Sequence, residues 1–256
     1  MIHPGKRILA VLAAALLTSP AAATAVPRDS VFFREDFDHL PLGQVEAAPA
    51  WTTDVDGGSL HIAPSATGRG HELRIHTDGN GHAFLVVSGL TPPANSFWVR
   101  LRLRVAAFPT APDWAHWTVA EASGSGSPTL VRPLGGQYVP GSGSNFWGVG
   151  SDLGPTGDWT AWQASVPAVG GSWRCVEFHL DASDNRVTVY LDGIEQTALA
   201  VSTKHHGGTS DNFVFPRFDT LKLGWQLYQA DPTPSSYDVQ VDDVIMSTQR
   251  VGDRTP

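Results

Sequence analysis

The sequence predicts an all-β protein, built as a single-domain antiparallel β-sandwich of the jelly-roll kind with a concave groove. Three observations predict it. Segments in which apolar and polar residues alternate recur along the chain, with turn-forming residues between them. Glycine and proline are frequent, at 26 and 19 residues, while long helical periodicity is absent. Sandwiches of this size often form one unit, so we expect one domain over residues 26–256.

The strands are expected where this alternation is clearest. In FWVRLRLRV, residues 97–105, one face is apolar and the other carries three arginines. In LKLGWQLY, residues 221–228, the leucines and Trp225 form a core face, while Lys222, Gln226 and Tyr228 lie on the other. The strand that contains LKLGWQLY is expected to begin at residue 218. Further strands are expected at 72–77, 82–89, 116–122, 129–137, 173–181, 186–193 and 237–247. The turn at Asp184-Asn185 predicts a hairpin over 173–193. The glycine- and serine-rich stretches 123–128 and 138–158 are expected to be loops.

The first residues predict a secretory signal peptide, residues 1–25. Lys6 and Arg7 precede a short apolar run, and Ala23-Thr24-Ala25 has the pattern of a cleavage site. The run is too short to span a membrane as a mature helix, and no second run is long enough to cross a bilayer. We therefore expect a secreted, extracellular protein that is a monomer and has no membrane partner.

Charge and motifs exclude several classes of function. The formal net charge is -8 and no basic run is present, which argues against nucleic acid as a partner. No nucleophile elbow, zinc-protease motif or phosphate loop occurs. Cys175 is the single cysteine, so no disulfide forms within the chain, and we interpret it as a small buried hydrophobic residue.

Three C-terminal segments carry a resemblance: WRCVEFHLDASDNRVTVYLDG, LKLGWQLYQAD and VDDVIMSTQRVG. They resemble the cellulose-induced secreted proteins of cellulolytic fungi and their bacterial relatives. The resemblance extends upstream through REDFD, GHAFLVV, FWVRLRLRV, AHWTV and RPLGGQY. That family is a polysaccharide-lyase-like jelly roll, related in shape to glucuronan and alginate lyases. The resemblance implies β-elimination on a uronic-acid-containing polysaccharide, in plant cell wall degradation.

The resemblance also implies a catalytic set on the concave face. His116 alternates away from the apolar face of its strand and would be the base, and Tyr228 would be the acid. Arg132 and Gln137 would neutralise the substrate's carboxylate. The arginine of the family aligns with Pro133 here, so Arg132 faces the groove only if Pro133 introduces a bulge.

Further residues are expected to bind the substrate, namely His82, Gln226, Trp117 and Trp147. Two other functions remain open. The first is a non-catalytic carbohydrate-binding protein that stacks sugar rings on Trp114, Trp117, Trp147 or Tyr228. The second is a glycoside hydrolase with two carboxylates from different strands. The fold serves all three functions.

A structural calcium ion is the one cofactor expected. By resemblance, the first and last strands of the sandwich meet beside a loop and hold the ion. Its ligands would be Asp38, Asp242 and backbone carbonyls near Gly68 and His71. Oxygen ligands of this kind suit Ca²⁺.

Overall fold

A computed structural model describes residues 27–66 and 68–253. The expected signal peptide, residues 1–25, lies outside this part of the chain. Fifteen strands form here, with three short 3-10 helices, η1 (Arg28–Ser30), η2 (Pro93–Asn95) and η3 (Thr197–Leu199). Within the described residues, no helix has the length and apolar character needed to cross a membrane.

The strands are, in chain order, β1 (Val31–Glu35), β2 (Gly43–Gln44), β3 (Ala47–Ala48), β4 (Trp51–Pro64), β5 (His71–Ser88), β6 (Phe97–Val105), β7 (Ala115–Ser125), β8 (Leu130–Val139), β9 (Ser144–Asp152), β10 (Trp159–Ala161), β11 (Arg174–Asp181), β12 (Arg186–Leu191), β13 (Ile194–Glu195), β14 (Arg217–Gln229) and β15 (Ser236–Ser247). Their pairing is antiparallel, in the order β10-β9-β8-β7-β14-β5-β15-β6-β11-β12-β13. In addition, β4 pairs with β5 and β1 with β15. The chain is thus the predicted antiparallel jelly roll.

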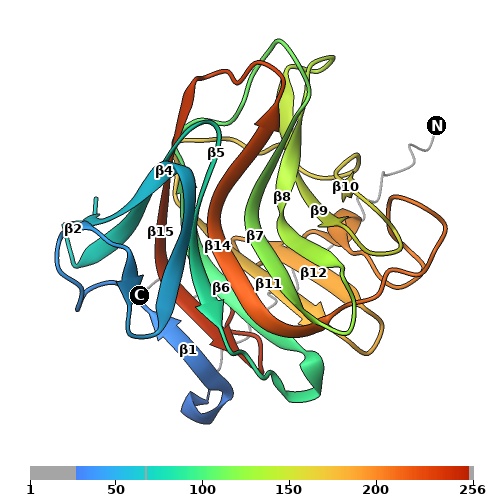
Figure 1. Cartoon of the computed structure of the whole chain (residues 1–256), viewed down its shortest axis with the longest axis horizontal. Coiled ribbons are helices and arrows are strands. Elements are labelled where there is room, and N and C mark those ends of the chain that lie inside the picture. Colours follow the sequence, from blue (N-terminus) through green and yellow to red (C-terminus); the bar gives the residue numbers. More distant parts are fainter. Residues whose placement is uncertain (1–26, 67, 254–256) are drawn as a thin grey trace, which may run out of the picture.

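One continuous sheet makes both layers of the sandwich because β5 passes from one to the other. Its first part, Leu73–Asp78, pairs with β15, and its second part, His82–Ser88, pairs with β14. Between them the chain bends at Gly79, whose φ of 51° lies in the left-handed region that favours glycine. Figure 1 shows β14, β7 and β8 in front of β6, β11 and β12. We call these the front layer and the back layer.

The core lies between the two layers and confirms the alternation predicted from the sequence. The predicted core face of β6 and that of β14, including Trp225, are almost completely buried. Trp225 stacks on Trp117, with ring centroids 5.6 Å apart. The hairpin predicted over 173–193 is formed by β11 and β12, with Asn185 at a φ of 47° in its turn.

Both stretches expected to be loops contain strand residues instead. β7 continues to Ser125, and the stretch 138–158 contains β9. Glycine misled the prediction, because here it serves close packing rather than a turn. A Cβ on Gly148 would lie 2.7 Å from Thr160 Cγ2, and one on Gly150 would lie 2.3 Å from the Trp159 carbonyl oxygen. Glycine in a strand often marks such a close approach.

The outer face of the front layer is concave at its β10 edge. In a flat sheet, the three steps from β7 to β10 would span about 14 Å, at about 4.8 Å for each. Yet the Nδ1 atom of His116 on β7 lies 3.3 Å from the Oγ1 atom of Thr160 on β10. The sheet therefore curls toward this face, which we call the concave face.

Candidate functional site

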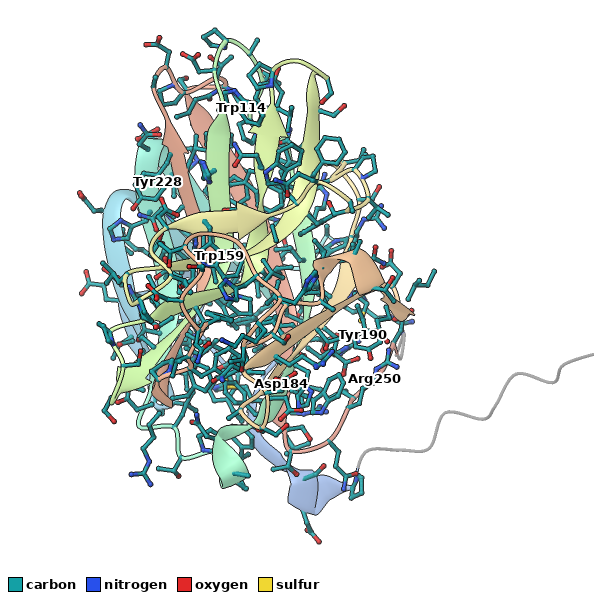
Figure 2. The ribbon with its side chains drawn as sticks, turned by 90° about the vertical axis from the view of Figure 1, so that its right-hand side faces the viewer. Trp114, Trp159, Asp184, Tyr190, Tyr228 and Arg250 are labelled. Atoms are coloured by element: carbon teal, nitrogen blue, oxygen red, sulfur yellow. The ribbon has the colours of Figure 1, made fainter. Side chains whose placement is uncertain are left out.

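A row of polar side chains crosses the concave face on three adjacent strands. Tyr228 on β14 lies directly opposite His116 on β7, and His116 lies opposite Gln137 on β8. Directly opposite residues of an antiparallel pair share a face, with Cβ atoms about 5 Å apart. The Tyr228 side chain is 54% exposed, and its hydroxyl accepts a hydrogen bond from Gln226 Nε2 at 2.8 Å. Figure 2 shows Tyr228 on the flank opposite Tyr190 and Arg250.

The pKa values of His116 and Tyr228 are shifted in opposite directions. Burial lowers the pKa of the His116 imidazole, and the nearby Arg132 charge lowers it further. Burial raises the pKa of the Tyr228 hydroxyl, and the charges of Asp152 and Glu121 act in the same direction. At neutral pH the imidazole is therefore neutral and the phenol is protonated. A neutral imidazole accepts a proton, and a protonated phenol donates one.

A network of charged groups lies next to this row. His82 on β5 is opposite Gln226, and its Nε2 atom lies 3.1 Å from Asp54 Oδ1. The other oxygen of Asp54 accepts a hydrogen bond from Lys222 Nζ at 2.8 Å, and Glu121 Oε2 lies 3.5 Å from the same ammonium. The Lys222 hydrogen bond is the main cause that lowers the pKa of Asp54. Burial raises the pKa of Glu121.

Arg132 lies on the concave side but is not presented to solvent. The pairing of β8 with β9 is irregular between Arg132 and Gly135, the stretch that contains Pro133. The Arg132 guanidinium is enclosed beneath β10. It forms ion pairs with Asp158 at 2.8 Å and Asp152 at 3.3 Å, and donates to the Trp159 carbonyl at 2.8 Å. Burial raises the pKa of Asp152 to about 6 although Arg132 opposes the shift.

The expectation that Arg132 and Gln137 neutralise a substrate carboxylate therefore needs correction. The two residues are only 5% and 2% exposed. Arg132 already faces two carboxylates, and Gln137 Nε2 donates to the neighbouring carbonyl of Tyr138 at 3.2 Å. Gln226 and His82, which lie next to His116 and Tyr228, are more exposed than Arg132 and Gln137.

Trp117 and Trp147 belong to the core, so their assignment to substrate binding was wrong. They are 1% and 2% exposed, and their rings make an edge contact at 5.3 Å. The reason is the alternation of each strand. Both residues lie one position after a residue of the concave face, which is His116 in β7 and Phe146 in β9.

Three aromatic residues besides Tyr228 lie close together on the concave side, namely Trp114, Trp162 and Phe146. The Trp114 side chain is 51% exposed and its ring centroid lies 5.8 Å from that of Trp162. Phe146 lies 5.7 Å from Trp162 and opposite Gln137, in the row that contains His116. We call these three side chains the aromatic cluster. Sequence reasoning named Trp114 but neither of the other two. Recognition of β9 as a strand would have placed Phe146 on this face, whereas Trp162 lies after β10.

Three of the residues expected at the calcium site, Asp38, His71 and Asp242, lie near one another. Asp38 Oδ1 accepts a hydrogen bond from the His71 amide at 2.7 Å, and a Cβ on Gly70 would lie 2.1 Å from the same oxygen. Burial raises the pKa of Asp242 to about 7, and the charge of Asp38 contributes to the shift. Gly68, with a φ of 74°, donates its amide to the carbonyl of Ser65 at 2.9 Å.

These donors fit a calcium ion. Two carboxylates near each other, one of them half-buried, are costly without a cation, and carboxylates beside a loop of backbone carbonyls match the oxygen preference of Ca²⁺. The His71 ring contacts the segment after β1, since its Nδ1 atom lies 3.1 Å from the Leu40 carbonyl oxygen. Glu35, Asp36 and His39 also cluster within 4.8 Å of one another. Glu35 has a structural role there, since its oxygens accept from the Phe37 amide and the Trp51 indole.

Comparison with solved structures places the fold. The structure of a protein named "Cellulose induced protein, Cip1" matches with a TM-score of 0.59 and 18% identity, over 87% of this chain and 100% of that one. A botulinum neurotoxin serotype D/C binding domain matches with a TM-score of 0.55 and 9% identity, over 87% of this chain and 49% of that one. A sialidase matches with a TM-score of 0.53 and 11% identity, over 86% of this chain and 18% of that one.

The chain has the jelly-roll fold of Cip1. At these identities the likeness shows the fold alone. No protein-family model matches the sequence, and no curated protein matches it at a significant level. The function therefore has to be argued from the side chains of the concave face.

Proposed function

We propose that the concave face binds a polysaccharide and cleaves it next to a uronic acid by β-elimination. The observation that carries the proposal is the pair His116 and Tyr228, directly opposite each other on β7 and β14. Their pKa values are shifted in the directions that leave a neutral imidazole beside a protonated phenol. Histidine and tyrosine are side chains that serve as general base and general acid.

In the proposed reaction, His116 takes the proton from the carbon next to the substrate's carboxylate. The electrons of that C–H bond form a carbon–carbon double bond, and the bond to the glycosidic oxygen breaks. Tyr228 protonates the departing oxygen. Gln226 Nε2 holds the Tyr228 hydroxyl at 2.8 Å, which orients the acid. We propose that Gln226 and His82, rather than Arg132 and Gln137, contact the carboxylate.

The aromatic cluster supports polysaccharide binding. Trp114 precedes His116 by two residues, and Phe146 lies in the same row as His116. Aromatic faces contribute large apolar area at little conformational cost, and their amphipathic character suits sugar rings. In the proposal, the cluster holds sugar units on the β9 side of His116 and Tyr228.

A second candidate is a carbohydrate-binding protein without catalysis. The ion pairs of Arg132 favour it, because they engage the guanidinium that would otherwise offset the substrate's charge. It predicts that the chain binds a polysaccharide and releases no product. The test is incubation with uronic-acid polymers in the presence of calcium, with ultraviolet absorbance for the unsaturated product and pull-down for binding. New reducing ends without the absorbance would indicate hydrolysis instead.

We also propose that Asp38, Asp242 and carbonyls of the loop before His71 hold a structural calcium ion. The ion would fasten the last strand, β15, to the segment after β1, in a chain whose single cysteine forms no internal disulfide. It would take no part in the elimination. The pattern at residues 1–25 further supports the proposal that the protein acts outside the cell.

A further inference from the structure

The outer face of the back layer carries a cleft that the proposed function does not use. Its volume is about 180 Å³, and three arginines line it, namely Arg100 and Arg102 of β6 and Arg174 of β11. Arg102 lies opposite Cys175 of β11, so the single cysteine of the chain also borders the cleft. Trp173, Asp192 and Asp253 complete the lining.

The aspartates of the cleft do not balance its arginines. Asp192 is committed, since it pairs with Arg174 Nη1 at 2.5 Å and accepts from the Cys175 amide at 3.0 Å. With Asp253 as the second carboxylate, three positive groups face two negative ones. By formal charge, the lining of the cleft therefore includes one more arginine than aspartate.

Arg102 is the arginine best placed to contact a ligand. Its guanidinium lies 5.5 Å from the centre of the Trp173 ring, a cation–π arrangement that holds it in position. Among the described residues, no carboxylate lies within ion-pair distance of it. Asp242, opposite it on β15, interacts with its charge but does not line the cleft. A guanidinium presents its N–H groups as a planar fork that matches two oxygens of one anion.

We propose that this cleft binds one small oxyanion, of the class of sulfate or a sugar carboxylate, with Arg102 as its main contact. The site is separate from the concave face, because it lies on the outward face of β6 and β11 in the other layer. If His116 and Tyr228 do not catalyse β-elimination, the anion site is unaffected. If the cleft binds no anion, the proposed function is likewise unaffected.

Cys175 provides a built-in reporter, since it borders the cleft and is the only thiol of the chain. The experiment measures the rate at which iodoacetamide, a small neutral reagent, alkylates the full chain. Three parallel arms contain sulfate, glucuronate, or chloride at matched ionic strength. Burial raises the pKa of the Cys175 thiol, although Arg100 opposes the shift. The reaction is therefore run in a mildly alkaline buffer, which increases the fraction of reactive thiolate.

An anion in the cleft should slow the reaction by mass action. At a concentration about ten times its dissociation constant, the rate should fall about tenfold, because only the free fraction reacts. Protection by sulfate alone indicates an inorganic anion, and protection by glucuronate indicates a sugar acid. Both results support the site. Equal rates in all three arms overturn it.

Two variants locate the effect at Arg102. Arg102→Gln removes the proposed contact and should abolish protection. Arg104→Gln is the matched control, since Arg104 lies two residues on along the same face of β6 but donates to Gln240 and to the Gly171 carbonyl. It should retain protection. Unchanged protection in Arg102→Gln, or equal loss in Arg104→Gln, overturns the assignment.

Thermal unfolding gives a second reading that does not depend on the reactivity of the thiol. Sulfate or glucuronate should raise the melting temperature above the chloride value by more in the wild type than in Arg102→Gln, because sulfate also stabilises proteins without a specific site. The same scans show whether the variant is folded. Equal shifts in the two proteins, together with absence of protection, reject the proposal.

Discussion

Tyr228 and His116 face each other across strands β14 and β7 on the concave face, and their pKa values are displaced in opposite directions. Each displacement leaves the group in its uncharged form at neutral pH. This relationship distinguishes the pair from the other polar residues on the solvent-exposed face of a sheet. Perturbed titratable groups cluster at functional sites, although structural networks also produce them.

Tyr228→Phe should abolish elimination and leave the fold unchanged. The substitution removes only the hydroxyl, which lies on an exposed side chain and bonds to Gln226. Loss of a general acid typically costs about 10²–10⁴-fold in rate. The measurement is the rate of ultraviolet absorbance on a uronic-acid polymer. Tyr190→Phe is the matched control, because Tyr190 bonds to Glu195 in the back layer. A Tyr228 variant that retains the wild-type rate contradicts the role of the acid.

The pH profile should reflect the lowered pKa of His116. The imidazole must be neutral to take a proton, so activity falls as pH drops through its pKa. Burial and Arg132 place that pKa below the ordinary value of about 6.5. The acid limb of kcat/KM should therefore lie below that value and should disappear in His116→Ala together with the activity. An acid limb above the ordinary histidine value would mean that another group is the base.

Two tryptophans separated by three positions should respond differently to replacement by alanine. Trp114→Ala should weaken polysaccharide binding and leave stability nearly unchanged, because its side chain is half exposed. Trp117→Ala should cost about 3–5 kcal/mol of stability, since it empties a core site between Trp147 and Trp225. Pull-down with insoluble polysaccharide and urea unfolding measure the two effects. Loss of binding only in unfolded variants would exclude Trp114 from the site.

Calcium should stabilise the chain through Asp38 and Asp242. At a concentration about 100 times the dissociation constant, a bound ion adds about 2.7 kcal/mol to the free energy of unfolding. The calcium-dependent rise in melting temperature should be lost in Asp242→Asn. Asp238→Asn is the control, since Asp238 is also on β15 but pairs with His76. An equal rise in all three proteins would place the ion elsewhere.

Asp152 should make stability decrease as pH rises. Its folded pKa of about 6 lies above the ordinary value of about 3.9. A raised pKa means that the folded state holds the proton more tightly, so the contribution is complete below about pH 4 and is lost as pH rises through about 6. Asp152→Asn should remove this dependence. Urea unfolding from pH 4 to pH 7 measures it, and identical pH dependence in variant and wild type contradicts the prediction.

The alternation in the sequence predicted the fold well because the core of a sandwich obeys a two-residue period. Both faces of β14 were read correctly from LKLGWQLY, since Trp225 and its neighbouring leucines are buried and Tyr228 is exposed. The same rule would have assigned Trp117 to the core, as it lies next to His116.

The parts of the site that were missed depend on contacts distant in sequence. Arg132 is enclosed because β10 curls over it and supplies Asp158 and a backbone carbonyl, and no local pattern encodes that approach. The glycines of β9 looked like loop residues, but Gly148 and Gly150 leave room for Thr160 and Arg132. Trp162 follows β10 and reaches Trp114 only through the same curvature.

The central claim is that His116 and Tyr228 carry out β-elimination on a uronic-acid polymer. The most direct test incubates the wild type and Tyr228→Phe with glucuronan, alginate and pectin, with calcium present, and follows the ultraviolet absorbance of the unsaturated product. We predict that absorbance grows with at least one polymer for the wild type and not for the variant. No absorbance from the wild type with any of the three would contradict the claim.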